Sequence, residues 1–289
     1  MDRRTFIAAA TSAVAVAGVT HAAEPRFTVE VKGSGPDVIL IPGLTSSRSV
    51  WDGVAAHLQG KYRLHLVQLG GFAGAPVAGN KDGLVAAGVA EELAAYIKAK
   101  GLKKPAVIGH SMGGTMGMML TARHPDLVGR LMVIDMFPKL AVAFFGPTAT
   151  PEQIAANAGA IKARLENAPL AEHEASTRQT IAGMVKTPAA REEIVRQGLT
   201  SDRNVQARSM HELLTTDLTP ELAKVIAPVT VVYPTDASLP FTANYPAWYA
   251  AAYAPLTGAK LVQVDGSYHF IMIDQAAALN AAIDTFLAG

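Results

Sequence analysis

One turn constrains this chain more than any other stretch of its sequence. Gly-His-Ser-Met-Gly occupies positions 109–113, and a further glycine follows. Residues 104–108 have the character of a short strand, and residues 115–124, rich in Met and Leu, indicate a helix. Glycines beside Ser111 let a strand and a helix pack closely around a strained bend, which pushes the hydroxyl out at the carboxyl edge of a sheet. A Gly-x-Ser-x-Gly turn between strand and helix therefore predicts that Ser111 is a nucleophile.

Strands and helices alternate on both sides of this turn. Apolar or alternating runs predict strands over residues 27–32, 38–41, 63–69, 131–135, 228–233 and 260–264. Helical spacing predicts helices over residues 49–58, 82–100 and 274–287. With 289 residues, half of them hydrophobic, the chain can bury a full core. The alternation predicts an α/β fold with a doubly wound, mostly parallel sheet.

The alternation stops between about residues 139 and 224. This segment contains only amphipathic helical patterns, interrupted by prolines. It leaves the predicted sheet just after Asp135 and returns just before Asp236, at the edge where Ser111 emerges. We therefore expect an inserted helical lid above Ser111, with apolar side chains lining an acyl pocket. The alternative is a purely structural or oligomer-forming element.

An activated serine needs a base within hydrogen-bond reach and a carboxylate that orients the base. In an open parallel sheet, such groups belong on loops at the carboxyl ends of strands. Asp236 follows one predicted strand and His269 follows the last one. These positions predict a triad of Ser111, His269 and Asp236, and Asp135, at the end of the strand before the insertion, is the alternative acid.

The other histidines of this region are weaker candidates for the base. His124, His173 and His211 lie on or between predicted helices rather than after a strand. His110 adjoins the serine and is predicted to pack inside the fold. The methionines after the turn are predicted to fill the core, since Met adapts to irregular gaps.

The strand-turn-helix around Ser111 and the chain order Ser, Asp, His resemble those of α/β-hydrolases with a helical lid, over residues 27–289. The resemblance implies that Ser111 is the nucleophile, His269 the general base and Asp236 the acid. It also implies an oxyanion hole formed by the backbone N–H groups of Leu44 and Met112.

Two positions depart from the pattern of many family members. Pro42 stands where many carry a histidine, and Gln68 stands where many carry an aspartate. Neither position belongs to the expected triad.

The resemblance implies a cofactor-free serine hydrolase that cleaves a small or medium carboxylic ester through an acyl-enzyme. Acyl transfer and the hydrolysis of amides, lactones or carbon–carbon bonds use the same residues and are alternatives. A non-catalytic binding protein on this fold is a further alternative. The presence of Ser, Asp and His in this chain order argues against a binding protein, because a binder does not need all three residues.

Composition and motifs exclude several other classes. A formal net charge of +1 without basic runs argues against nucleic-acid binding. The chain has no cysteine, which excludes disulfides and thiolate metal sites. It also lacks His-Glu-x-x-His, and residues 70–74 lack the Lys-Ser/Thr pair of a phosphate loop. The expected partner is a small acyl substrate, with no metal or cofactor.

The first 22 residues form a separate unit. Arg3 and Arg4 precede an alanine- and valine-rich run, which ends in Thr-His-Ala at positions 20–22. A charged start, a short apolar run and a small-x-small site predict a signal peptide, and hence a periplasmic or secreted protein with residues 23–289 as the hydrolase domain. The arginine pair followed by Phe6 resembles a twin-arginine signal, and the general secretory route is the alternative. The apolar run is too short for a stable membrane anchor.

Overall fold

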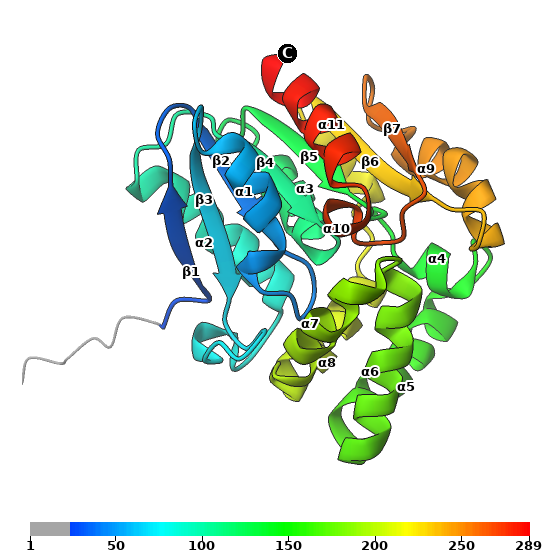
Figure 1. Cartoon of the computed structure of the whole chain (residues 1–289). Helices are drawn as coiled ribbons and strands as arrows, with labels where there is room; N and C mark the ends of the chain where they lie inside the picture. The colour runs from blue at the N-terminus through cyan, green and yellow to red at the C-terminus, as the bar shows by residue number, and fades with distance from the viewer. Residues whose placement is uncertain (1–23) are drawn as a thin grey trace, which may run out of the picture.

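The computed structural model describes residues 24–289, so the predicted signal peptide lies outside the described residues. These residues form one seven-stranded sheet with the order β1-β3-β2-β4-β5-β6-β7 (Figure 1). β1 pairs antiparallel with β3, and all other neighbouring strands are parallel. The predicted α/β fold with a mostly parallel sheet is confirmed. The strands are β1 (Phe27–Lys32), β2 (Asp37–Ile41), β3 (Arg63–Leu69), β4 (Ala106–His110), β5 (Arg130–Ile134), β6 (Val229–Thr235) and β7 (Lys260–Asp265).

Helices cover both faces of the sheet, and each face has its own hydrophobic core. One core packs against α2, α3 and α9, and the other packs against α1, α10 and α11. The covering helices are α1 (Asp52–Leu58), α2 (Val85–Ala99), α3 (Met112–Arg123), α9 (Tyr245–Tyr253), α10 (Ile271–Asp274) and α11 (Ala276–Ala288). Short 3₁₀ turns complete the connections: η1 (Arg48–Trp51), η2 (Ala78–Asn80), η3 (Thr219–Lys224) and η4 (Pro240–Asn244).

The central strands are buried on both faces, as their continuous apolar runs predict. The four apolar residues of β2 are fully buried, and every residue of β4 is buried. The methionines of α3 also lie in the core, as expected, at Met112, Met116, Met118 and Met119. Strands β4 and β5 therefore lie in the buried centre of the sheet.

Between β5 and β6 the chain leaves the sheet and forms five helices, which lie beyond the carboxyl ends of the parallel strands (Figure 1). They are α4 (Ala141–Phe145), α5 (Pro151–Asn167), α6 (Leu170–Met184), α7 (Pro188–Leu199) and α8 (Arg203–Thr215). We call residues 139–224 the insertion. Local signals start its helices: Pro151 and Pro188 occupy first-turn positions, Thr150 forms a capping box with Gln153, and Asp202 caps α8.

Side chains of the insertion bind backbone groups of the sheet domain, which comprises residues 24–138 and 225–289. The buried carboxylate of Glu212 accepts hydrogen bonds of 2.6–2.8 Å from three successive N–H groups at the start of α2, those of residues 85–87. These N–H groups have no partner within their own helix, and the positive end of the helix dipole favours an anion there. The Gln197 side chain accepts a bond of 2.8 Å from the N–H of Ser47. The insertion is thus fixed to the loops that follow the strands.

Candidate active site

Ser111 lies in a strained turn between β4 and α3, as predicted. Its φ is 52°, a left-handed conformation that side chains rarely adopt. Its N–H donates to the carbonyl of Ile134 at 2.8 Å. A Cβ at Gly109 would come within 2.2 Å of the Gly113 oxygen, and one at Gly113 within 2.2 Å of the Ile41 oxygen. Glycine is therefore required at both positions for the strand and helix to pack around the serine.

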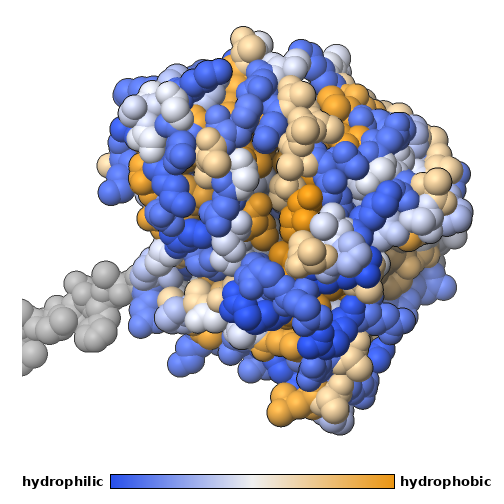
Figure 2. Space-filling model, viewed as in Figure 1, coloured by the Kyte–Doolittle hydropathy of each residue, from blue (hydrophilic) through white to orange (hydrophobic). Residues whose placement is uncertain are grey.

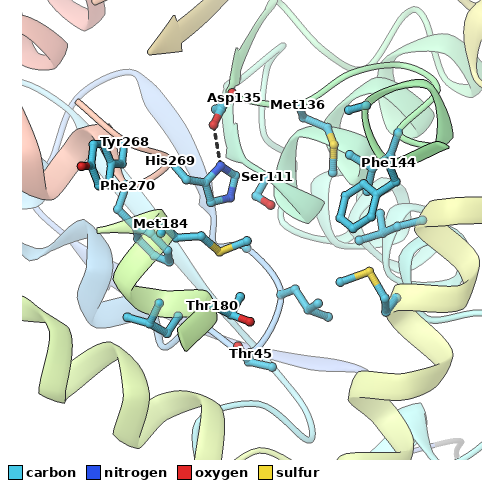
Figure 3. Close-up of a pocket in the computed structure, with 18 of the residues that line it drawn as sticks. Thr45, Ser111, Asp135, Met136, Phe144, Thr180, Met184, Tyr268, His269 and Phe270 are labelled. Atoms are coloured by element: carbon cyan, nitrogen blue, oxygen red, sulfur yellow. Dashed lines mark hydrogen bonds and ion pairs between the residues drawn. The ribbon is translucent and has the colours of Figure 1, made fainter. Parts of the chain in front are cut away.

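His269 lies on the loop after β7, and its imidazole binds a carboxylate. A hydrogen bond of 2.5 Å joins His269 Nδ1 to Asp135 Oδ2. Figure 3 shows this bond and the Ser111 side chain beside the same imidazole ring. The side chains of Asp135 and His269 are only 10% and 20% exposed. The structure therefore brings together Ser111, His269 and Asp135.

Asp236 does not bind His269, so the prediction that Asp236 orients this histidine is wrong. Asp236 Oδ2 instead accepts a bond of 2.5 Å from Lys186 Nζ, which belongs to the insertion. Its Oδ1 accepts from the N–H of Ser238 at 2.9 Å and from the Ser238 hydroxyl. Hydrogen bonds from Lys186 and Ser238 lower the pKa of Asp236 to about 2. The carboxylate is thus held toward the insertion, and Asp135, the alternative acid, occupies the position beside the imidazole.

Of the two residues expected to supply oxyanion-hole N–H groups, Met112 directly follows Ser111, and Leu44 lines the same cavity as Ser111. Met112 is the first residue of α3, where a helix N–H has no intrahelical acceptor. A Cβ at Gly43, which precedes Leu44, would lie 3.1 Å from Ser111 Cβ. The positive end of the α3 dipole favours negative charge at this point.

His110 is fully buried and packs against His269. Its Nε2 lies 3.1 Å from the His269 carbonyl oxygen, and the two ring centroids are 4.5 Å apart. Burial, together with the nearby His269, holds the pKa of His110 well below its usual value. The predicted packing position of His110 inside the fold agrees with this burial.

A cavity of about 500 Å³ opens above Ser111 and reaches into the insertion. The loop after β2 contributes its floor, and the insertion contributes a mostly apolar wall with Leu140, Phe144, Ile161, Leu165, Ile181, Met184, Met210 and Leu213. Figure 3 places Phe144 and Met184 on either side of it. Figure 2 shows hydrophobic side chains gathered where the insertion meets the sheet domain. The cavity can therefore hold an apolar group next to a reactive serine.

The remaining histidine candidates lie away from the serine. His124 pairs with Glu91 at 2.8 Å near the far end of α3, and His211 lies on α8. His173 lies on α6 and lines the wall of the cavity. Burial, together with nearby Arg203, lowers the pKa of His173 and favours its neutral form. Within residues 24–289, no group of three or more acidic and histidine side chains is arranged to hold a metal ion, and no helix is long and apolar enough to cross a bilayer.

The model of the alpha/beta hydrolase family matches residues 38–282. The chain belongs to the α/β-hydrolase family. A pimeloyl-[acyl-carrier protein] methyl ester esterase from Aeromonas hydrophila is 31% identical over 128 residues, which cover 44% of this chain and 48% of that protein. The chain thus spans about half the length of the curated relative it matches.

Solved structures share the complete α/β-hydrolase architecture. A thermophilic esterase from Thermogutta terrifontis superposes with a TM-score of 0.74 at 20% identity, covering 91% of this chain and 93% of the other. An enol-lactonase from Burkholderia xenovorans LB400 gives 0.73 at 18% identity, covering 91% and 96%. At these identities the likeness establishes the fold of this chain. The superfamily predicted from the turn at Ser111 is confirmed.

Two residues around this site had no signal in the sequence. Lys186 lies in the turn between α6 and α7, 50 residues before the aspartate it binds. The Tyr249 hydroxyl binds Asp135 Oδ1 at 2.5 Å from α9, which follows the next strand of the sheet. Both partnerships depend on tertiary packing, which no local sequence pattern encodes.

Proposed function

We propose that this protein is a serine hydrolase that cleaves carboxylic esters, with Ser111, His269 and Asp135 as its catalytic residues. The observation that carries the proposal is the hydrogen bond between His269 Nδ1 and Asp135 Oδ2, beside a serine in a strained strand-to-helix turn. An esterase and an enol-lactonase among the proteins of this fold, and a methyl ester esterase among the relatives, support the choice of ester chemistry.

The reaction follows from the roles that these groups can take. The second imidazole nitrogen of His269 accepts the proton of the Ser111 hydroxyl while its oxygen attacks the ester carbonyl. Asp135 holds the ring in the required tautomer and stabilises the imidazolium that forms. The tetrahedral oxyanion accepts hydrogen bonds from the N–H groups of Leu44 and Met112. His269 then protonates the leaving alcohol, and water, activated by the same base, releases the acid from the acyl-enzyme.

The cavity suggests where the acyl group lies. A largely apolar wall from the insertion faces Ser111, and the cavity volume of about 500 Å³ suits a small or medium group. We therefore propose that the insertion acts as a lid and that its apolar residues select the length of the acyl chain.

A panel of p-nitrophenyl esters, from acetate to dodecanoate, tests this proposal. We expect turnover with an optimum at short or intermediate length, because longer chains exceed the cavity. Ser111→Ala should lower kcat by about a thousandfold or more while the melting temperature changes little. A variant that keeps more than about a hundredth of wild-type turnover would remove Ser111 from the mechanism. A matched anilide and lactone in the panel distinguish ester hydrolysis from its alternatives.

A further inference from the structure

The carboxylate of Asp135 is bound at both of its oxygens. Oδ2 binds His269 Nδ1 at 2.5 Å, and Oδ1 accepts a hydrogen bond of 2.5 Å from the hydroxyl of Tyr249. One carboxylate thus joins the imidazole to a phenol. Because a carboxylate held at one oxygen only can still rotate about its Cβ–Cγ bond, the second bond fixes the plane in which Oδ2 is presented to the ring.

The ring of Tyr249 is itself held rigidly. It is 0% exposed and is stacked between two aromatic rings, with centroids 4.2 Å from Phe137 and 4.6 Å from Tyr233, and with the planes inclined by 24° and 13°. Such stacks restrict both tilt and displacement of the ring. The hydroxyl therefore has one direction in which to donate, toward Asp135.

We propose that Tyr249 is a positioning residue that acts through Asp135, as a fourth member of the chain Ser111–His269–Asp135. The inference rests on the proposed function, because it assigns a role only if Asp135 orients His269 in catalysis. Tyr249 borders the cavity but is 0% exposed, and its hydroxyl is bound to Asp135, so it acts on the ester only through that carboxylate. It sets the orientation and the charge of the carboxylate that the imidazole meets.

The chemistry of the phenol suits this role. Burial, with the Asp135 charge adding to it, raises the pKa of Tyr249 far above its usual value, so the hydroxyl keeps its proton and can only donate to the carboxylate. The titratable side chains that pack around its ring are Tyr233, Tyr245 and Tyr253, together with Asp135 at its hydroxyl. None of the three tyrosines supplies a competing charge at neutral pH.

The position of α9 explains why the tyrosine can reach this carboxylate. Asp135 follows β5, and α9 belongs to the connection that follows the neighbouring strand β6. Asp236 begins that same connection but is bound to Lys186 and Ser238. The connection after β6 thus serves the site through its tyrosine rather than through its aspartate.

Tyr249→Phe removes the hydroxyl and keeps the stacked ring. We expect kcat to fall about tenfold with KM nearly unchanged, because a hydrogen bond to a charged group is lost. We also expect the acidic limb of the pH–rate profile to move to higher pH, since a carboxylate without this donor attracts the imidazolium more strongly. In an Asp135→Asn background the same change should have less than about a twofold effect on kcat, because the carboxylate it acts on is gone.

Tyr253→Phe is the matched control. Tyr253 lies one turn further along α9, is 2% exposed, and donates from its hydroxyl to the Met136 carbonyl at 2.7 Å without touching Asp135. We expect a similar loss of melting temperature but less than about a twofold change in kcat and no shift of the pH profile. Equal kcat losses in the two variants, or an unshifted profile in Tyr249→Phe, would overturn the inference. An active Asp135→Asn variant would instead contradict the proposed function.

Discussion

At the scale of single residues, Ser111 and Asp135 share an unusual positive φ at equivalent places in the sheet. Their φ angles are 52° and 47°, and each residue directly follows its strand, β4 or β5. The N–H of each still donates at 2.8 Å to the neighbouring strand before the chain turns. Holding a non-glycine residue at a positive φ costs about 1–3 kcal/mol of folding free energy. The packing of the surrounding buried sheet must offset this cost. The two bends direct both side chains to one edge of the sheet.

The two aspartates can be compared directly by substitution. Asp135→Asn should lower kcat by about a thousandfold or more, because an amide cannot hold the required tautomer of His269. Asp236→Asn should lower it by less than about tenfold, because this carboxylate binds Lys186 rather than the imidazole. Steady-state kinetics on one ester, with circular dichroism of both variants, measures the difference. If Asp236→Asn remained folded and lost more kcat than Asp135→Asn, Asp236 would be the residue that orients His269.

The ion pair of Asp236 also predicts a dependence of stability on pH. Its pKa is lowered from 3.8 to about 2, so the folded state holds the ionised form more strongly than the unfolded chain does. This contribution is fully present above about pH 4 and is lost as the pH falls toward 2. The gap in unfolding free energy between wild type and Asp236→Asn should therefore narrow below pH 4. Urea titrations from pH 7 to pH 3 measure it, and a gap that widens with acid would contradict this pairing.

The sequence predicted two of the three catalytic candidates and misassigned the third. Ser111 has a local signature, and His269 is the only histidine that follows a strand in the second half of the chain. Asp135 and Asp236 both follow parallel strands and differ only in where their carboxylates point. That direction depends on Lys186 and Tyr249, which pack there only in the folded molecule.

At the scale of elements, the strands matched their predicted ranges within a residue or two, because buried parallel strands leave continuous apolar runs. Helix ends agreed less well. The expected helix over residues 49–58 begins as η1 and continues as α1, and the one over residues 274–287 is preceded by α10, with a break at Gln275. Gln275 has non-helical dihedrals, and its side chain donates to the carbonyl of Gly266 at 3.1 Å. Hydrophobic periodicity in the sequence cannot predict this tertiary contact, so the break at Gln275 was not expected.

The helices of the insertion allow a test of the proposed acyl pocket. Phe144 of α4 lines the cavity yet is 48% exposed, so Phe144→Ala should change stability little. We expect it to shift the preferred ester length by altering transition-state contacts worth about 1–3 kcal/mol per methylene. Leu170→Ala is the control, because Leu170 is 77% exposed on α6 and does not line the cavity. The ester panel measures both, and equal activity losses at every length in Phe144→Ala would mean that α4 has only a structural role.

At the scale of the whole molecule, the insertion and the sheet domain form one assembly around the site. Glu212 of α8 caps α2, and Asp274 accepts from the N–H groups of Lys186, Thr187 and Tyr268, which links the α6–α7 turn to the loop of His269. The fold class and the family could be predicted from the alternation of strands and helices and from the turn at Ser111, because these two features leave local patterns in the sequence. Export through the segment 1–22 stays a prediction.

We propose that Ser111 is a nucleophile activated by His269 and Asp135. A fluorophosphonate probe tests it most directly, because such probes form a covalent bond with serines activated in this way. We expect rapid labelling of the wild type at neutral pH, with the adduct mapped by mass spectrometry to the peptide that contains Ser111. Labelling should be absent in Ser111→Ala and at least about a hundredfold slower in Asp135→Asn. An unlabelled wild type, or an adduct on another residue, would contradict the assignment of Ser111 as the nucleophile.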